Sequence, residues 1–360
     1  MYTNQTDEEL DAMRCTSSGI FKAQNSVWMK FNFLLSYLIV LLTFYFSLRA
    51  AKLLKNHNVY SHGAQYLLFF TLFNGNLNQA VFLEIKIRQL AHILAYSNDP
   101  CKIEFRNSEC VYDHDVFAFS TVLSTWLVSA LTCDRFVSFF APITYKKQSK
   151  MVAYFFLISS VYLSLSRILM PVYLSFLKIT LTFPVHFYVY GGISRAGYVP
   201  SCQYAPQRSL KAFEVVNIGS FWLTMATFVL TILILLLNVV RNRKIKKTVF
   251  DTAARYSSFE NLVTTKAICS ICSTQFAFLS FSYAIVSIIR SMEVGIPEEV
   301  FHIVGQYLAG VLYGNLSMPI IIILKTNQCI EKRRTSIGKM TKHSFHENAY
   351  FKSLKAAWEA

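Results

Sequence analysis

Long apolar runs without charged residues alternate with short polar segments along most of the chain. A helix needs about 20 residues, at about 1.5 Å each, to cross the ~30 Å hydrocarbon core of a bilayer. Backbone groups inside lipid must pair within their own segment, so a spanning run of this kind is helical. The pattern therefore predicts an all-α membrane protein, a seven-transmembrane helix bundle. The predicted spans are 31–48, 62–83, 116–133, 151–173, 215–240, 267–289 and 300–324.

These spans divide the chain into an N-terminal segment (1–30), a seven-helix transmembrane domain (31–324) and a tail (325–360). The chain begins MYTNQTDEELDAMRC, which is polar and acidic. It lacks the basic start and apolar core of a cleavable signal peptide. We therefore expect the first helix to serve as its own insertion signal.

The composition favours a membrane protein over a soluble one. Hydrophobic residues make up 54% of the chain and charged residues only 15%, whereas soluble domains carry about 25% charged residues. The apolar residues also come in runs instead of being scattered. A large soluble enzyme with an apolar core does not fit this distribution.

Basic residues are distributed unevenly between the two sets of predicted loops. The segments on the side of the C-terminus carry 22 of the 35 Lys and Arg residues, against 12 on the other side, while acidic residues divide 6 against 14. Basic loops stay cytoplasmic, so we expect the N-terminus outside and the C-terminus inside. The net charge of +15 then indicates loops that face anionic membrane lipid, and not nucleic acid.

Two further features agree with this orientation. Asn4 begins the glycosylation acceptor NQT, which is usable only on the outer side. Cys15, Cys101, Cys110 and Cys202 all fall in predicted outer segments, an even number in an oxidising compartment. Their positions alone leave open which of the possible disulfide pairings forms.

An adjacent acid and base, Asp134 and Arg135, stand at the inner end of the third predicted span. One interpretation is that they simply flank the span, with the long arginine reaching the headgroups. The other is a switch, in which Asp134 holds Arg135 at rest and releases it toward a cytoplasmic partner. Because the pair lies at the membrane edge, replacement of Arg135 by Ala is expected to spare folding.

The sequence around this pair resembles the third helix of rhodopsin-like G-protein-coupled receptors. That helix ends in Asp/Glu-Arg-Tyr, with a proline seven residues after the arginine. This chain has Asp134-Arg135-Phe136 followed by Pro142, so Phe136 replaces the tyrosine. The resemblance implies a switch for G-protein coupling made of Asp134, Arg135, Phe136, Pro142 and Tyr145.

Two other motifs carry the same resemblance. These receptors have a cysteine 25 residues before the arginine, tied to the second outer loop; Cys110 stands at that place, and Cys202 lies in the corresponding loop. The resemblance implies a Cys110–Cys202 disulfide, with Cys15–Cys101 as the second bridge. The seventh span contains NLSMP, which is similar to the polar-then-proline break of the family and singles out Asn315, Ser317 and Pro319.

Most of the chain is similar to the nematode serpentine chemoreceptors of class alpha, the Sra family. The segments that carry this likeness are CTSS, EIKIRQL, PCKIEF, SEC, LTCDRF and NLSMPIIII. The likeness implies a G-protein-coupled chemosensory receptor in the plasma membrane, multi-pass, of a chemosensory neuron. It implies a small-molecule chemical ligand and a heterotrimeric G protein as partners, and no cofactor.

The ligand pocket is expected near the outer ends of the helices. Amine receptors have an Asp 18 residues before the arginine, but this chain has Phe117 there, so a monoamine ligand is not expected. Aromatic, hydroxyl and amide side chains suit a small, mostly neutral molecule, although Ser and Thr in membrane helices mostly bond to backbone or to a neighbouring helix. Arg167 is expected either to line this pocket or to reach the outer headgroups. The candidate pocket residues are Phe117, Thr121, Ser124, Arg167, Gln306 and Tyr307.

The start of the tail contains one candidate modification site. Cys329 lies shortly after the seventh predicted span, as palmitoylated juxtamembrane cysteines do. The basic residues that follow it suit a short helix along the inner leaflet.

Other functional classes fit less well. A membrane enzyme needs clustered catalytic side chains, whereas the 8 histidines are scattered and neither His-Glu-x-x-His nor Gly-x-Ser-x-Gly occurs. Cys269 and Cys272 have a CxxC spacing inside an apolar span without further ligands, so no metal site is predicted. A seven-span ligand-gated channel or a small-molecule transporter is the remaining alternative. It would call for an inside N-terminus or for paired half-repeats, and neither is seen in the sequence.

Overall fold

The computed structural model describes residues 15–57, 59–165, 196–204, 209–248, 252–291 and 297–359. Two predicted site residues, Asn4 and Arg167, lie outside these ranges. The helices are α2 (Ser18–Asn25), α3 (Val27–Asn56), α4 (His62–Ala95), α5 (Val111–Phe140), α6 (Pro142–Leu165), α8 (Leu210–Thr248), α9 (Thr252–Ser291), α10 (Glu298–Tyr307) and α11 (Gly310–Glu359), and the strands are β1 (Phe105–Arg106) and β2 (Tyr198–Val199).

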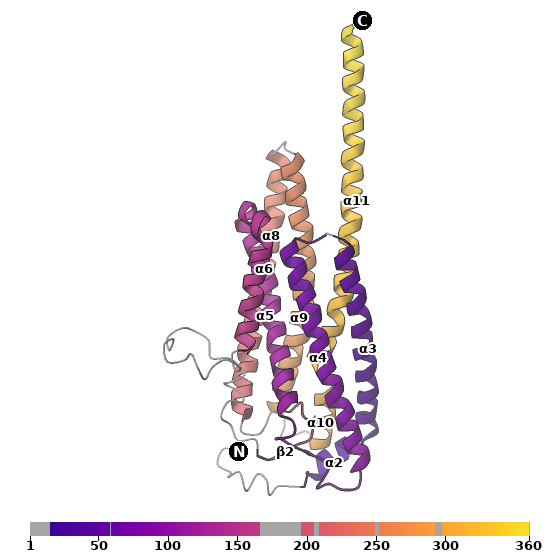
Figure 1. Ribbon diagram of the computed structural model, residues 1–360, viewed down its shortest axis with the longest axis vertical. Helices are drawn as coiled ribbons and strands as arrows, with labels where there is room; N and C mark the ends of the chain where they lie inside the picture. The colour runs from indigo at the N-terminus through magenta and orange to yellow at the C-terminus, as the bar shows by residue number, and fades with distance from the viewer. Residues whose placement is uncertain are drawn as a thin grey trace, which may run out of the picture.

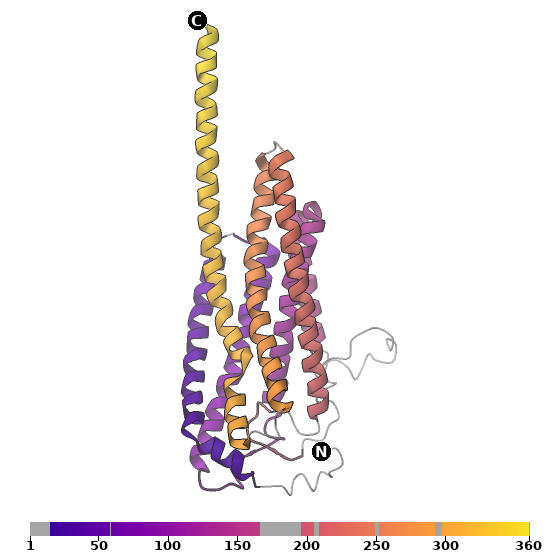
Figure 2. The ribbon, with the colours of Figure 1, turned by 180° about the vertical axis from the view of Figure 1, so that it is seen from behind.

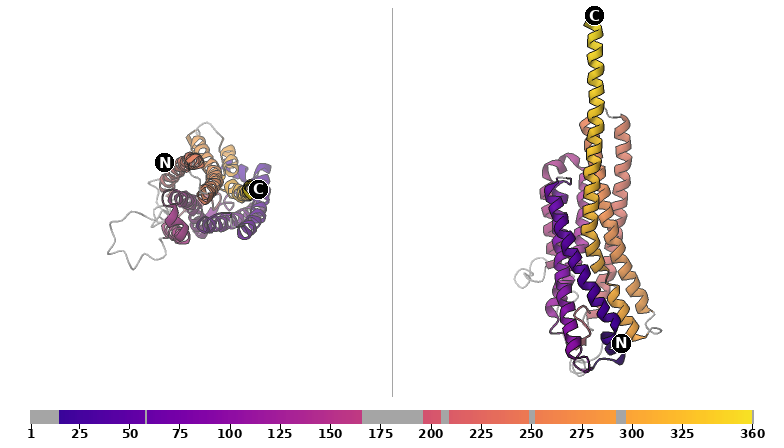
Figure 3. Two further views of the ribbon diagram at one scale, coloured as in Figure 1. Left: turned by 90° about the horizontal axis from the view of Figure 1, so that it is seen from above. Right: turned by 90° about the vertical axis from the view of Figure 1, so that its right-hand side faces the viewer.

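The long helices run side by side along the long axis of the molecule (Figures 1 and 2). Helix α3 packs on α4, α4 on α5, α5 on α6 and α8, α8 on α9, α9 on α11, and α11 returns to α3. Seen from above, these contacts close the helices into a bundle (Figure 3). The short strands and helices α2 and α10 gather at one end, and the C-terminus lies beyond the other end.

Five helical segments of the described residues are long and apolar enough to cross a membrane: Val27–Asn56, Val111–Phe140, Glu214–Ile245, Asn261–Phe281 and Glu298–Thr335. The predicted span 62–83 falls in α4, and residues 151–165 of the predicted span 151–173 fall in α6. Helix α4 carries several amides and, toward its end, charged residues, and the described part of α6 ends within the predicted span 151–173. Seven crossings therefore remain a prediction from the sequence.

The bundle is apolar outside and partly polar inside. Leu34, Leu38 and Leu41 of α3 are each more than half exposed, whereas Asn32 and Thr43 of the same helix are buried. A soluble protein shows the opposite pattern, because water favours polar groups on the surface. Polar side chains between helices and leucines on the outside suit a bundle whose solvent is lipid.

The seventh predicted span, 300–324, differs from expectation in two ways. It is not continuous, because α10 ends at Tyr307 and α11 begins at Gly310. Helix α11 also continues past the bundle to Glu359 instead of turning into a separate surface helix (Figures 1 and 2). Between Leu324 and Glu359 the chain has no proline and a single glycine, Gly338, so the sequence supplies little that would break the helix.

Candidate functional site

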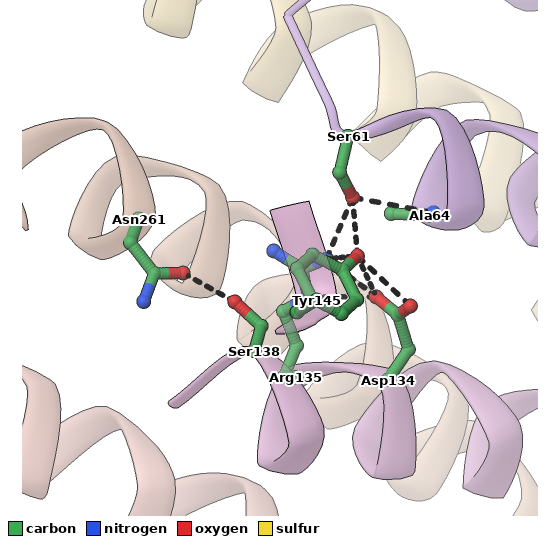
Figure 4. Close-up of polar contacts among 7 residues, drawn as sticks. All are labelled: Ser61, Ala64, Asp134, Arg135, Ser138, Tyr145 and Asn261. Atoms are coloured by element: carbon green, nitrogen blue, oxygen red, sulfur yellow. Dashed lines mark hydrogen bonds and ion pairs between the residues drawn. The ribbon is translucent and has the colours of Figure 1, made fainter. Parts of the chain in front are cut away.

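Asp134 and Arg135 lie near the C-terminal end of α5 and point into the bundle (Figure 4). Asp134 is 0% exposed and Arg135 is 3% exposed. Arg135 donates to Oδ2 of Asp134 from both Nε, at 3.1 Å, and Nη2. Nη2 also donates to Oγ of Ser61 at 2.9 Å and to the hydroxyl of Tyr145 at 2.7 Å. Ser61, Asp134, Arg135 and Tyr145 are called the Arg135 cluster below.

The two neutral members of the Arg135 cluster come from other segments of the chain. Ser61 is the N-cap of α4, where its hydroxyl accepts from the backbone N–H of Ala64. Tyr145 lies in the first turn of α6, which begins at Pro142 directly after α5 ends. The cluster therefore connects α4, α5 and α6 at one level of the bundle.

Tyr145 also binds the carboxylate of Asp134. Its hydroxyl donates to Oδ1 at 2.9 Å or to Oδ2 at 3.0 Å. Burial raises the pKa of Tyr145, which lies between the predicted spans, to about 12. The phenol therefore keeps its proton at neutral pH and remains available as a donor to Asp134.

This geometry corrects two expectations about Arg135. The side chain does not extend to the headgroups, because it is buried and bound to Asp134. Its removal is also not expected to spare folding. Removing one member of a buried ion pair leaves the other charge uncompensated, which typically costs about 3–5 kcal/mol.

Gly63, in the first turn of α4, permits the close approach on which the cluster depends. A Cβ atom at this position would lie 2.4 Å from the backbone oxygen of Ser149 in α6 and 3.1 Å from Oδ1 of Asp134. The first contact is with backbone, which cannot swing away as a flexible side chain can. Any side chain at position 63 would therefore separate α4 from α6 next to the Arg135 cluster.

A second polar contact joins the same end of α5 to α9. Ser138 donates from Oγ to Oδ1 of Asn261 at 3.0 Å (Figure 4). Phe136 instead points out of the bundle, is 41% exposed and packs on Phe140. Of the residues in the resembling motif, Asp134, Arg135 and Tyr145 meet in the cluster, while Phe136 and Pro142 do not touch its polar atoms in the contacts described.

Polar residues also connect α4, α5 and α11 in the middle of the bundle. Asn78 donates to Oγ of Ser120 at 2.7 Å and to Oγ1 of Thr121 at 3.3 Å. Asn315 of α11 donates to Oδ1 of Asn78 at 3.0 Å. One turn along α4, Asn74 donates to Ser124 at 2.9 Å. These bonds tie α11 to α4 and α5, which lie far from it in the sequence.

The seventh-span motif otherwise stays within its own helix. Oγ of Ser317 donates to the backbone oxygen of Gly314 at 2.9 Å. Pro319 lies inside α11 without ending it. Only Asn315 of this motif reaches another helix through a side-chain hydrogen bond in the contacts described.

The candidate pocket residues contact separate sets of partners. Phe117 packs on Phe82, and Thr121 belongs to the polar connection with α4. Tyr307 donates to the backbone oxygen of Trp28 in α3 at 2.8 Å, whereas Gln306 is buried inside the bundle. These contacts do not define a ligand site, and the pocket remains a prediction.

Gln306 instead binds Lys86, a charged residue that the sequence did not single out. Lys86 of α4 is 0% exposed, and its ammonium donates to Oε1 of Gln306 and, at 3.5 Å, to Oδ1 of Asn32. The ammonium also lies 5.3 Å and 5.2 Å from the ring centroids of Phe33 and Phe82. No ion pair formed among the described residues includes Lys86.

If the helical periodicity of the second predicted span is continued past residue 83, it indicates that Lys86 lies on the buried face. It lies three residues beyond the predicted span 62–83, and it is four residues after Phe82, on the buried face of α4. Positions three and four apart on a helix lie on the same face. No comparable signal marks Ser61 or Gly63, because their roles depend on backbone positions set by other helices.

We expect Lys86 to make the stability of the protein depend on pH. Burial lowers its pKa from 10.5 to about 7. Below about pH 7 the folded state contains a buried, charged ammonium at Lys86, which lowers its stability. As pH rises from 7 toward 10.5, Lys86 loses its proton in the folded state before it does so in the unfolded state. Stability should therefore rise with pH across this window.

The measurement is the midpoint of thermal unfolding of the detergent-purified protein between about pH 6.5 and about pH 9. The midpoint should rise for the wild type and stay flatter for Lys86→Met. Lys22→Met, at an exposed lysine of α2, is the matched control and should keep the wild-type slope. Equal slopes in Lys86→Met and the wild type would refute the assignment.

Two disulfides hold the end of the bundle where α2 and α10 lie. Cys110 is bonded to Cys202 and Cys15 to Cys101, the pairing that the resemblance implied. Beside the first bridge, Phe105 pairs with Val199 as strands β1 and β2 run antiparallel.

Cys329 is in a different environment from the one that palmitoylation would require. It is 4% exposed and packs in the core where α9 and α11 meet. Its Sγ lies 3.9 Å from the backbone oxygen of Val263. An acyl chain on this thiol would have to displace α9, so palmitoylation stays a prediction that this conformation does not favour.

Comparisons with known proteins give one consistent family. The sequence model described as "Serpentine type 7TM GPCR chemoreceptor Sra" matches residues 10–358. Serpentine receptor class alpha-27 of Caenorhabditis elegans is 56% identical, with 100% of this chain and 99% of that protein covered. Serpentine receptors class alpha-20 and alpha-17 of the same organism are 32% and 31% identical, each with 99% of this chain and 100% of the relative covered.

Proposed function

The chain belongs to the Sra family of serpentine seven-transmembrane chemoreceptors, and on this premise we propose how it works. It binds a small, mostly neutral molecule near the outer ends of the helices. It signals to a heterotrimeric G protein through the Arg135 cluster, with its N-terminus outside and its C-terminus inside the plasma membrane of a chemosensory neuron. The relatives in the comparison are receptors by name, and none is named as an enzyme.

The binding of Arg135 by three segments of the chain is the observation that supports the switch. Its guanidinium has partners on α5, at the start of α4 and at the start of α6. A shift of any of these segments would remove partners from a buried charge. The charge would then have to find new partners or water, and this second arrangement is the one that the proposed switch requires.

The position of the Arg135 cluster suits transmission to the cytoplasm. The excess of basic residues in the loops on the C-terminal side supports a location of this end of the bundle inside the cell. Helices α8 and α9 extend past α4 and α5 at the same end (Figure 1). The segment between the fifth and sixth spans, with RNRKIKK, supplies a basic surface near the cluster for the G protein.

A ligand screen on cells that express the receptor, read through second messengers, tests the proposal. An epitope tag at residue 2, stained on intact cells, counts surface receptors and tests the orientation. The test variant is Asp134→Asn/Arg135→Gln. It removes both buried charges together, so that no charge stays buried without its partner. This variant should reach the surface and lose the response to any ligand found for the wild type. An unchanged response would refute the switch, and tag staining only after permeabilisation would refute the orientation.

A further inference from the structure

A cavity of about 400 Å³ lies where α8, α9 and α11 meet, at the end of the bundle nearer the C-terminus. Arg243 of α8, Lys266 of α9 and Lys332 of α11 line it. None of the ion pairs formed among the described residues includes any of the three. Three cations from three helices thus face one space without an acidic partner in that part of the chain.

The level of these cations in the membrane follows from the predicted spans. Arg243 comes three residues after the span 215–240, and Lys266 directly precedes the span 267–289. At about 1.5 Å per residue both lie within about 5 Å of the hydrocarbon boundary, where lipid phosphates are found. Lys332 lies further along α11, but side chains on a helix tilt toward its N-terminus, which here is toward the membrane.

The remaining walls of the cavity are largely apolar. Val239, Leu262 and Val263 line it, and the first of these lies inside the predicted span 215–240. A ligand that matches the whole cavity has a strongly anionic part beside the cations and an apolar part beside these side chains.

We propose that this cavity binds an anionic phospholipid of the inner leaflet whose headgroup carries phosphomonoester groups. The inference rests on the proposed orientation, but not on the chemical ligand or on the switch. Basic pockets between membrane helices on the cytoplasmic side are suited to such headgroups. A singly charged headgroup would leave part of the positive charge uncompensated, whereas a phosphorylated inositol headgroup offers several negative charges to the three cations.

The test measures lipid retained by the purified receptor, with native mass spectrometry, after incubation with phosphatidylcholine vesicles that contain phosphatidylinositol 4,5-bisphosphate. No chemical ligand or G protein is added, so the outcome is independent of the signalling proposal. A cation near an anionic surface contributes about 1 kcal/mol, or about fivefold in affinity. Arg243→Gln/Lys266→Gln/Lys332→Gln should therefore bind this lipid on the order of a hundredfold more weakly.

The matched control is Lys244→Gln/Lys325→Gln/Arg334→Gln, which removes the same charge from α8 and α11 at residues that do not line the cavity. It should keep most of the lipid binding. If both triple variants lose the lipid equally, general attraction to the basic face explains the binding and the proposal fails. It also fails if phosphatidylserine at matched total charge is retained equally well.

One further arm identifies the source of the phosphate. Soluble inositol 1,4,5-trisphosphate should bind receptor in pure phosphatidylcholine vesicles much more weakly than the lipid does, and equal binding would indicate a site for a free phosphate. If the three cations are needed for G-protein binding in the absence of any anionic lipid, the cavity is a protein docking site instead.

Should the triple variant fail to fold, as judged by thermal unfolding, Lys266→Gln alone should still lower lipid affinity about fivefold.

Discussion

Receptors that carry Asp134→Asn should signal without ligand. The substitution keeps the shape of the side chain but removes the negative charge that compensates the buried guanidinium of Arg135. Removing one member of a buried ion pair typically costs about 3–5 kcal/mol, and this cost falls on the arrangement in which Arg135 stays buried. The resting arrangement should therefore lose on the order of a hundredfold in population relative to one in which Arg135 reaches new partners or water. The measurement is second-messenger output per surface receptor in untreated cells, compared with the wild type.

Two other substitutions make this prediction sharper. Tyr145→Phe removes the neutral donor to Asp134 and should raise basal output in the same direction but by less. Tyr154→Phe, in the same helix, is its control, because Tyr154 packs on Tyr66 and is half exposed. Basal signalling that is unchanged in Asp134→Asn at normal surface level would show that the Arg135 cluster is structural only.

Loss of the Cys110–Cys202 bridge should remove most of the receptor from the cell surface. The bridge joins residues 92 apart in sequence, and both cysteines are buried, at 0% and 1% exposed. Removing a native disulfide typically costs about 2–5 kcal/mol, a large part of the total stability of most domains. Surface staining of the tagged Cys202→Ser receptor on intact cells measures the effect.

Free cysteines provide the control for this experiment. Cys133 and Cys269 form no disulfide, so Cys133→Ser and Cys269→Ser should each stain nearly as well as the wild type. Cys110→Ser should resemble Cys202→Ser, because either change leaves the same bond unmade. A surface level for both that matches the controls would mean that the strand pair and surrounding packing hold this end without the bridge.

The sequence predicts those parts of the structure that depend on local repeats or on fixed spacing. Long apolar runs located the helices, since hydropathy is a property of each segment by itself. The pair Asp134-Arg135 was identified because two charges are adjacent at the end of such a run. The cysteine pairing followed from family spacing and not from chemistry, because four cysteines in one compartment admit several pairings.

Features that depend on contacts between distant segments were missed or misjudged. The burial of Arg135 was not foreseen, because Ser61 and Tyr145, which bind it, belong to other segments. The buried position of Lys86 was not foreseen, because a hydropathy boundary ends at the first charges even when the helix continues. The separation of α10 from α11 was missed because no proline stands between Tyr307 and Gly310.

The absence of a side chain at Gly63 has a consequence for how mutations of its codon would be inherited. Because α6 backbone and Asp134 occupy the space that a Cβ atom would need, a change of this codon to that of any other amino acid adds bulk beside the Arg135 cluster. Under the proposed switch, such an allele would weaken the resting arrangement and act as a gain of function, which is dominant in a heterozygote, although the residue has no chemistry of its own. Under the same proposal, selection on this codon would act against ligand-independent signalling, and not against loss of the response to a ligand.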